Sequence, residues 1–178
     1  MTRTAHLTSG AILALGAISH YTLVSNITLP DTWLAGLVIA ILAGSTAPDW
    51  MEVPYFSKTL NTRVSLIPHR TITHWMLLWG AVFFYCLIDW NNPKTPYDPM
   101  TLIVLGFSLG ALTHCIMDWL TADGVPIFIP FLFGNQSLHM IRGFTGEWLS
   151  MLSMGAITYY LIKYGKTLEI GHFFQTLS

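Results

Sequence analysis

Charged side chains are scarce in this sequence. Lysine and arginine number 8, and aspartate and glutamate number 9, so charged residues make up only 10% of the 178 residues. Soluble domains usually carry about 25% charged residues, and the mean hydropathy here is +0.54. The deficit therefore indicates a membrane protein embedded in a lipid bilayer. The net charge of −1 also excludes the basic surface on which nucleic-acid binding depends, so we expect no nucleic-acid partner.

Cysteine is equally scarce, and targeting signals are not evident. Cys86 and Cys115 lie inside apolar runs, which predicts buried thiols in place of a disulfide. We expect no cleavable signal peptide, because only Arg3 stands as a charge before the first apolar run and His6 lies inside that run. Internal repeats and low-complexity stretches are lacking as well. The length suits a single integral membrane domain over residues 1–178.

Long apolar runs are what the sequence does contain. A membrane-spanning helix needs roughly 20 mostly apolar residues. The runs that meet or nearly meet this length are 5–24, 32–48, 72–89, 99–119 and 147–164. They predict an all-α fold, a polytopic membrane bundle of about five transmembrane helices. The apolar segment 125–133 is short and broken by prolines, so we interpret it as interfacial or re-entrant.

Polar residues gather on one side of this predicted bundle. With five spans, the N-terminus and the connections 49–71 and 120–146 share one side of the membrane. The ionisable residues expected there include His6, Asp49, Glu52, His69, Arg70, His74, His114, Asp118, His139, Arg142 and Glu147. Ionisable residues near membrane depth are costly and are functional candidates by default. The pattern predicts a polar site at one membrane face.

The spacing of these residues favours a metal site. His114 and Asp118 are four residues apart and share one helix face, where an imidazole and a carboxylate can bind one ion. His69 and His74 can converge only if His69 lies in a loop before the helix, with Thr71 as a possible N-cap. Such mixed ligands suit zinc, manganese or iron.

The predicted centre holds one to three divalent ions. Its predicted ligands are His6, Asp49, His69, His74, His114 and Asp118. A lone histidine at a helix end is usually an interfacial residue, and His139 remains open between the two interpretations. His20 lies about 21 Å along the helix from His6, so we expect it outside the site.

Four segments carry a resemblance to a known family. They read AHLTSG, APDWMEVP, HRTITHW and THCIMDWLTADGVPIFIPF. In order and spacing they resemble the motifs of the YdjM-like family of bacterial inner-membrane, predicted metal-dependent hydrolases. This sequence departs from the family pattern at Thr71 and Trp75, which replace a glycine and a serine. Met51 replaces the second acid of the PDID-type motif, and Glu52 is the nearest substitute. Glu147, in TGEWL, matches a late family glutamate less distinctively, and the resemblance adds it as a seventh predicted ligand.

The family is itself distantly similar to zinc-dependent phospholipases C and nucleases of the P1 type. The resemblance therefore implies hydrolysis of a phosphoester, with zinc as the first choice of metal and a membrane lipid or lipid-linked substrate. Metal-activated water would be the nucleophile. Asp49 or Glu147 would act as general base, and Arg70, with Arg142, would neutralise the phosphate. Both arginines can equally anchor to lipid phosphate.

Rival functions come from other classes. A non-catalytic membrane protein could use the same residues as a closed structural metal site, or could be an adaptor whose polar loops dock a partner. A transporter is disfavoured, because the predicted spans have almost no ionisable residues at their centres.

The orientation in the membrane follows from the basic residues. There are five on the polar side and three on the other, which favours a cytoplasmic location for the polar side. The count becomes three against three if Arg70 and Arg142 are catalytic.

Overall fold

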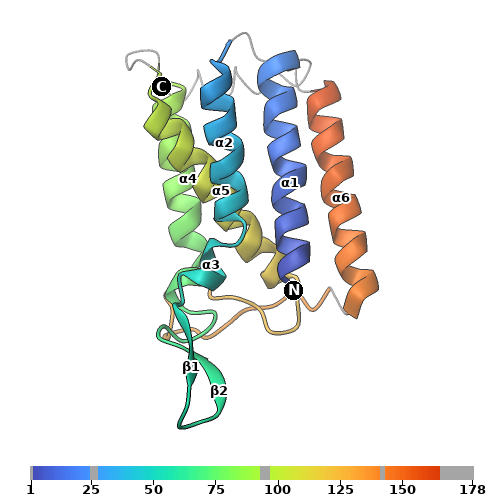
Figure 1. The fold of residues 1–178 in the computed structure, drawn as a ribbon. Helices are drawn as coiled ribbons and strands as arrows, with labels where there is room; N and C mark the ends of the chain where they lie inside the picture. Colours follow the sequence, from blue (N-terminus) through green and yellow to red (C-terminus); the bar gives the residue numbers. More distant parts are fainter. Residues whose placement is uncertain (1, 25–27, 93–96, 141–142, 165–178) are drawn as a thin grey trace.

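The computed structural model describes residues 2–24, 28–92, 97–140 and 143–164 (Figure 1). Its α-helices are α1 (Arg3–Ser19), α2 (Asp31–Gly44), α3 (Ala47–Trp50), α4 (Met76–Trp90), α5 (Pro99–Trp119) and α6 (Gly143–Tyr164). A π-helical turn, η1 (His20–Val24), continues α1, and a 3₁₀ turn, η2 (Ile72–His74), precedes α4. Two strands, β1 (Pro54–Ser57) and β2 (Thr62–Ser65), form an antiparallel hairpin between α3 and η2.

The long helices stand side by side, and the short elements gather at one end (Figure 1). Helix α5 packs most extensively against α2 and α4, while α1 packs between α2 and α6. The main core lies where α2 and α5 meet, around Leu37, Ile41, Leu102 and Leu105. Helix α3, the hairpin and the connection after α5 all lie at the end where α1 begins (Figure 1), so one end of the molecule carries most of the irregular chain.

The prediction of about five transmembrane helices is wrong. Within the described residues, only α5 is both long and apolar enough to cross a membrane, with a mean hydropathy of 1.8. Helices α1, α2 and α4 have 17, 14 and 15 residues, so each extends less than the roughly 30 Å of a bilayer's hydrocarbon core at about 1.5 Å per residue. Helix α6 has 22 residues, but it fails on composition. The molecule is a mostly helical fold with one candidate span.

The prediction of an all-α fold also fails, in the connection 49–71. Residues 54–57 and 62–65 pair as strands, with Tyr55 opposite Val64 and Phe56 opposite Arg63. Aromatic and β-branched residues favour this pairing. Asn61 takes the left-handed conformation, with φ 48°, that the turn between the strands needs and that asparagine tolerates better than most residues.

The connection after α5 is irregular but held together. Val125 and Gln136 pair through backbone hydrogen bonds of 3.0 and 2.9 Å, and the Gln136 side-chain oxygen accepts a hydrogen bond from the Ile127 amide. Large apolar side chains between these points, including Phe131 and Leu132, remain exposed. The segment 125–133 thus forms no helix, in agreement with the prediction that it does not span the membrane.

Glycines allow α2 and α5 to approach closely. A methyl group added at Gly44 would collide with the Phe107 carbonyl, and one at Gly110 would collide with the Ile41 carbonyl. This close contact brings the last turn of α2 against the second half of α5. It therefore places the Ser45 carbonyl within reach of the His114 side chain.

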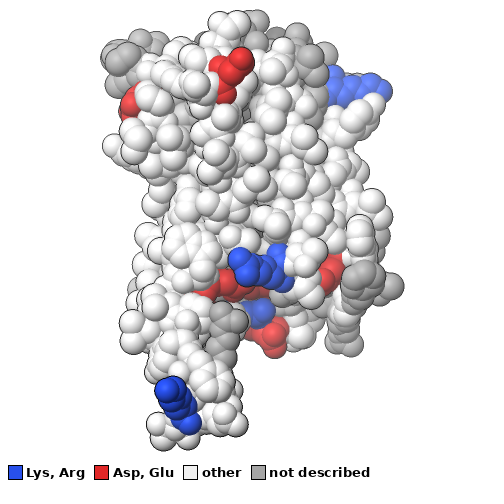
Figure 2. Space-filling view, viewed as in Figure 1, with Lys and Arg blue, Asp and Glu red and all other residues white. Residues whose placement is uncertain are grey.

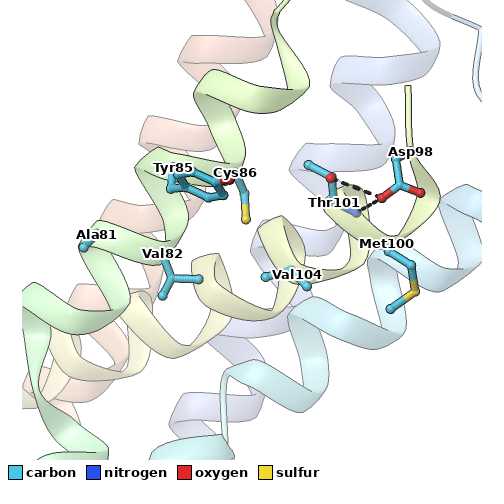
Figure 3. Close-up of a pocket in the computed structure, with 8 residues that line it drawn as sticks. All are labelled: Ala81, Val82, Tyr85, Cys86, Asp98, Met100, Thr101 and Val104. Carbon is cyan, nitrogen blue, oxygen red and sulfur yellow. Dashed lines mark hydrogen bonds between the residues drawn. The ribbon is translucent and has the colours of Figure 1, made fainter. Parts of the chain in front are cut away.

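A hollow lies between α4 and α5, toward the end of the molecule opposite the hairpin (Figure 3). Its volume is about 510 Å³. Val82 and Val104 face each other across it, while Asp98 turns toward Thr101 (Figure 3). Asp98 accepts hydrogen bonds from the Thr101 amide and hydroxyl at 3.0 and 3.2 Å, so the polar groups of this hollow serve to cap α5.

Candidate metal centre

The structure brings six of the seven predicted metal ligands together at one end of the bundle. Three groups each offer ligand atoms that lie within 4.8 Å of one another. They are His6 with His114 and Asp118, Asp49 with His74 and His114, and Glu52 with His69 and His74. Because His114 and His74 each belong to two groups, the three groups form one continuous cluster. These buried His, Asp and Glu clusters could hold metal ions.

His74 and His114 form the centre of the cluster, and their Nε2 atoms face each other at 3.2 Å. The His114 Nδ1 lies 2.8 Å from the Ser45 carbonyl oxygen, which can only accept, so Nδ1 donates the hydrogen bond. The His74 Nδ1 lies 3.2 Å from the Glu52 carboxylate and donates in the same way. Each neutral ring then directs the lone pair of its Nε2 toward the other. Opposed lone pairs repel unless a proton or a cation lies between them.

Two carboxylates extend this pair to four donors. Asp49 Oδ1 lies 3.5 Å from His74 Nε2 and 3.6 Å from His114 Nε2. Asp118 Oδ2 lies 3.6 Å from both nitrogens. Donors around a tetrahedral ion with bonds of about 2.0–2.1 Å are separated by about 3.3–3.4 Å. These five separations, one between the two nitrogens and four from the carboxylates to them, are 3.2–3.6 Å and therefore suit a zinc-sized ion. The donor types fit the predicted cofactor class.

His6 adds a further donor on the α1 side of the cluster. Its ring stacks on that of His114 with centroids 3.6 Å apart, and its Nε2 lies 3.3 Å from Asp118 Oδ1. Its Nδ1 is buried and has no hydrogen-bond partner among the described residues. Burying a polar atom without a partner is costly, so this unsatisfied nitrogen is a second sign that the cluster accommodates a ligand.

Glu52 is the main residue whose role the sequence left open. Its side chain is only 3% exposed, and its carboxylate accepts hydrogen bonds from the His69 ring at 2.8 Å and the Arg70 amide at 3.0 Å. Burial opposes ionisation of Glu52, but the hydrogen bonds from His74, His69 and the Arg70 amide outweigh it and lower the pKa of Glu52. The ionised carboxylate therefore orients two imidazoles of the cluster. The sequence feature that could have indicated this role is the position of Glu52 three residues after Asp49.

The motif HRTITHW reaches the cluster mostly as predicted. His69 lies in a loop, and its ring centroid is 5.3 Å from that of His74. His74 belongs to η2, and α4 begins only at Met76. Thr71 was predicted as a possible N-cap, but it makes no side-chain capping bond. Its hydroxyl donates to the Pro68 carbonyl at 2.6 Å instead.

Arg70, predicted to meet a substrate phosphate, is buried and bonded to protein groups. Its Nη2 lies 3.5 Å from Asp118 Oδ2, and its Nη1 lies 3.3 Å from Asp123 Oδ2. The same Nη1 donates to the Gly124 carbonyl at 3.3 Å. Arg70 also has the left-handed backbone conformation, with φ 56°. The guanidinium thus clamps Asp118 to the connection after α5.

The remaining predicted site residues lie apart from the cluster or outside the described part. Glu147 accepts hydrogen bonds from the amide and hydroxyl of Thr2, both at 2.9 Å, and belongs to none of the three ligand groups. His139 is exposed and also stands outside them. Arg142 lies outside the described residues. His20 begins η1 at the far end of α1, away from the cluster as expected.

Asp49 connects the buried cluster to solvent. Its side chain is 41% exposed, against 0% for His74 and 2% for Asp118. Burial raises the pKa of Asp49, but the hydrogen bond that a protonated His74 ring donates from Nε2 and the nearby rings of His114 and His6 outweigh it and lower that pKa to about 2. Burial also opposes the charged form of His74 and so lowers the pKa of His74, but the contacts with Asp49 and Glu52 raise that pKa more strongly. Asp49 is therefore ionised at neutral pH.

A polar hollow of about 290 Å³ opens beside Asp49. Residues around it include Arg3, Thr46, Asp49, Trp50, Glu52 and Ser65. Figure 2 shows basic and acidic side chains gathered on this face near the hairpin end, while the middle of the same face has none. The hollow gives the cluster an approach from outside the bundle.

The comparisons with known proteins identify the family. A family model described as "YdjM inner membrane protein" matches residues 1–176. The chain belongs to this family. The description gives the inner membrane as the location and names no reaction, so membrane location is shown and hydrolysis remains a prediction.

A relative of similar length supports a match over the whole chain. The protein YvsG of Bacillus subtilis (strain 168), whose name describes it as uncharacterized, is 24% identical over 170 residues. The alignment covers 93% of this chain and 99% of YvsG. No solved structure matches the chain.

Proposed function

We propose that this protein is an inner-membrane, metal-dependent hydrolase that cleaves a phosphoester of a lipid or lipid-linked substrate. The observation that carries the proposal is the buried pair of imidazole nitrogens, 3.2 Å apart, with two carboxylates at matching distances. Each ring is fixed in its tautomer by a hydrogen bond from its other nitrogen, which is how proteins usually orient metal-binding histidines.

The proposed ligand set divides into a buried part and an accessible part. His74, His114 and Asp118 are fully enclosed, and His6 supplies a further buried donor. Asp49 reaches the polar hollow. A bound divalent metal supplies the Lewis acidity that polarises a phosphoryl oxygen and makes a water acidic near neutral pH. Zinc fits the donor separations best, and manganese and iron accept the same ligand types.

Asp49 was predicted to act as general base and Arg70 to bind the phosphate. The structure favours a different role for each residue. A pKa of about 2 makes Asp49 a weak base, since a general base acts best with a pKa near the working pH. It is suited to bind metal and to accept a hydrogen bond from a water in the hollow. Arg70 serves as a positioning residue, because its guanidinium holds Asp118 and its amide donates to Glu52.

Lipid access is supported by apolar side chains at the same end of the molecule. Tyr55 and Phe56 on the hairpin, and Phe131 and Leu132 on the connection after α5, are each at least half exposed. Exposed apolar groups of this kind suit an interface with lipid. We propose that they bring the cluster to the bilayer surface, and that this end faces the cytoplasm.

A structural metal site is the rival that one observation favours. Four protein donors can fill every position of a tetrahedral ion, as in closed structural sites. The exposure of Asp49 argues for an open position, because solvent reaches one edge of the set. Replacing Asp49 with alanine distinguishes the two functions. A hydrolase keeps part of its metal and loses activity, whereas a closed site loses metal and folded stability together.

The test of the proposed function is phosphoester hydrolysis by zinc-loaded protein in detergent. The substrates are phospholipids of several headgroups, together with a soluble phosphodiester. Wild type and His139→Ala, the control with an exposed histidine outside the cluster, should hydrolyse the same substrate. His114→Ala should reduce the rate by at least about 100-fold, in keeping with loss of metal activation. Equal rates for His114→Ala and wild type would contradict the proposal.

A further inference from the structure

The polar hollow beside Asp49 is lined by an arginine whose role the contacts described so far do not explain. Arg3 lines this hollow with Asp49 and Glu52, and its side chain is exposed. Within the described part of the chain, the Arg3 guanidinium has neither a hydrogen bond nor an ion pair. Arg70, by contrast, is buried and paired with Asp118 and Asp123. Among the arginine side chains that the structure describes at the cluster, Arg3 is therefore the one that is free to bind an incoming anion.

The position of Arg3 is unfavourable for α1 itself. Arg3 is the first residue of α1, directly after the N-cap Thr2. A positive charge in the first turn of a helix is repelled by the helix dipole. Helix stability thus gives no reason for a cation here, whereas an anion bound in the hollow would give one.

We propose that the hollow is the subsite for the phosphoryl group of the substrate, and that Arg3 is its binding residue. This inference rests on the proposed function. A guanidinium forms two parallel charge-assisted hydrogen bonds with a phosphoryl group. The hollow of about 290 Å³ accommodates a phosphoryl group with a small substituent. The phosphoryl group can belong to a lipid headgroup or to a soluble phosphate.

Charge balance makes this subsite dependent on metal. Asp49 and Glu52 place two carboxylates around one guanidinium, so the hollow repels an anion when the cluster carries no cation. A divalent ion beside Asp49 reverses this balance. Binding linkage is reciprocal, so phosphate should also strengthen retention of the metal.

The test uses inorganic phosphate as the probe and isothermal titration calorimetry as the readout. Wild type is loaded with one equivalent of zinc and freed of excess. Arg3→Met should weaken phosphate binding by about 10- to 100-fold, the range for losing a charge-assisted hydrogen bond, and Arg3→Lys should restore part of it. Lys58→Met, which removes an exposed cation outside the hollow, should bind as wild type does. Metal-free protein should not bind phosphate.

Two competitors identify the source of the phosphoryl group. Phosphatidic acid in detergent micelles should displace phosphate at lower concentration than glycerol phosphate if the group belongs to a lipid. The reverse order would retain the subsite and assign it to a soluble phosphate. Unchanged phosphate affinity in Arg3→Met would overturn the inference even if zinc binding and hydrolysis are normal. Absence of zinc binding and of hydrolysis in wild type would instead overturn the proposed function.

Discussion

Two hollows in the described part of the molecule rank in opposite order by volume and by polarity of the lining. The larger, about 510 Å³ between α4 and α5, is lined mainly by apolar side chains, and its polar residues Asp98 and Thr101 bond to each other. The smaller, about 290 Å³, adjoins a buried cluster of ligand atoms. A binding site is therefore better indicated by polar groups left unsatisfied, such as the Nδ1 of His6, than by the volume of a cavity.

The largest effect is expected from the substitution Asp118→Ala. Asp118 contacts His6, His74, His114 and Arg70, so its loss removes a donor and leaves a buried guanidinium with fewer partners. We expect zinc affinity to fall by more than about 100-fold and stability to fall by about 3 kcal/mol, as when one partner of a buried ion pair is removed. Competition with a chelator and thermal unfolding measure the two effects. Wild-type zinc affinity in this variant would remove Asp118 from the ligand set.

Glu52→Gln tests the carboxylate that orients the histidines. The amide retains the shape but gives His74 and His69 a neutral acceptor, so zinc affinity should fall by about 10- to 100-fold, as is typical for residues that hold metal ligands in place. The same chelator competition measures it. An effect as large as that of Asp118→Ala would make Glu52 a direct ligand.

Zinc affinity should decrease as the pH falls. The raised pKa of His74 means that protons compete with metal from above pH 6.5 downward, by up to about 10-fold per pH unit for each histidine that is protonated. In the metal-free protein the same shift stabilises the fold at low pH and is lost as the pH rises through that pKa. Asp49, with a pKa of about 2, stays ionised and adds no slope between about pH 4 and 8. A flat affinity profile over that range would contradict the histidine ligand set.

The smallest effect is expected at the apolar hollow. Asp98→Ala removes the N-cap of α5, where the carboxylate accepts from the Thr101 amide, so the thermal midpoint should fall slightly. Zinc content and hydrolysis should not change, because the cap lies at the opposite end of α5 from His114. Loss of metal in this variant would show that the apolar hollow and the metal-ligand cluster, at the two ends of α5, are coupled.

Apolar composition predicted the positions of the helices better than their lengths. The run 99–119 coincides with α5, and each of the other predicted runs overlaps a helix. The run 32–48 overshoots because α2 ends at Gly44, before the turn at Ser45 and Thr46 that precedes Pro48. The run 72–89 starts too early because η2 and the extended Trp75 come before α4. The mean hydropathy of a segment reports how apolar it is, but it does not show where the helical backbone is interrupted.

The cluster was predictable from residue types, but the contacts that orient it were not. His114 and Asp118 share a helix face, so their proximity followed from the four-residue spacing. Glu52 and His69 are 17 residues apart and meet only because the hairpin between them folds back. The family resemblance predicted that Arg70 would meet a phosphate, yet the connection after α5 supplies its partners Asp123 and Gly124. Long-range contacts of this kind depend on chain reversals that local spacing does not encode.

His74 and His114 would together hold the metal in the proposed site, because their Nε2 atoms face each other at 3.2 Å. The most direct test is elemental analysis of protein purified in detergent without chelators and supplied with zinc or manganese, for wild type, His114→Ala and the control His139→Ala. We predict near-stoichiometric metal in wild type and in His139→Ala, and its loss in His114→Ala. Metal-free wild type, or equal metal in all three proteins, would contradict the assignment of His114 as a metal ligand.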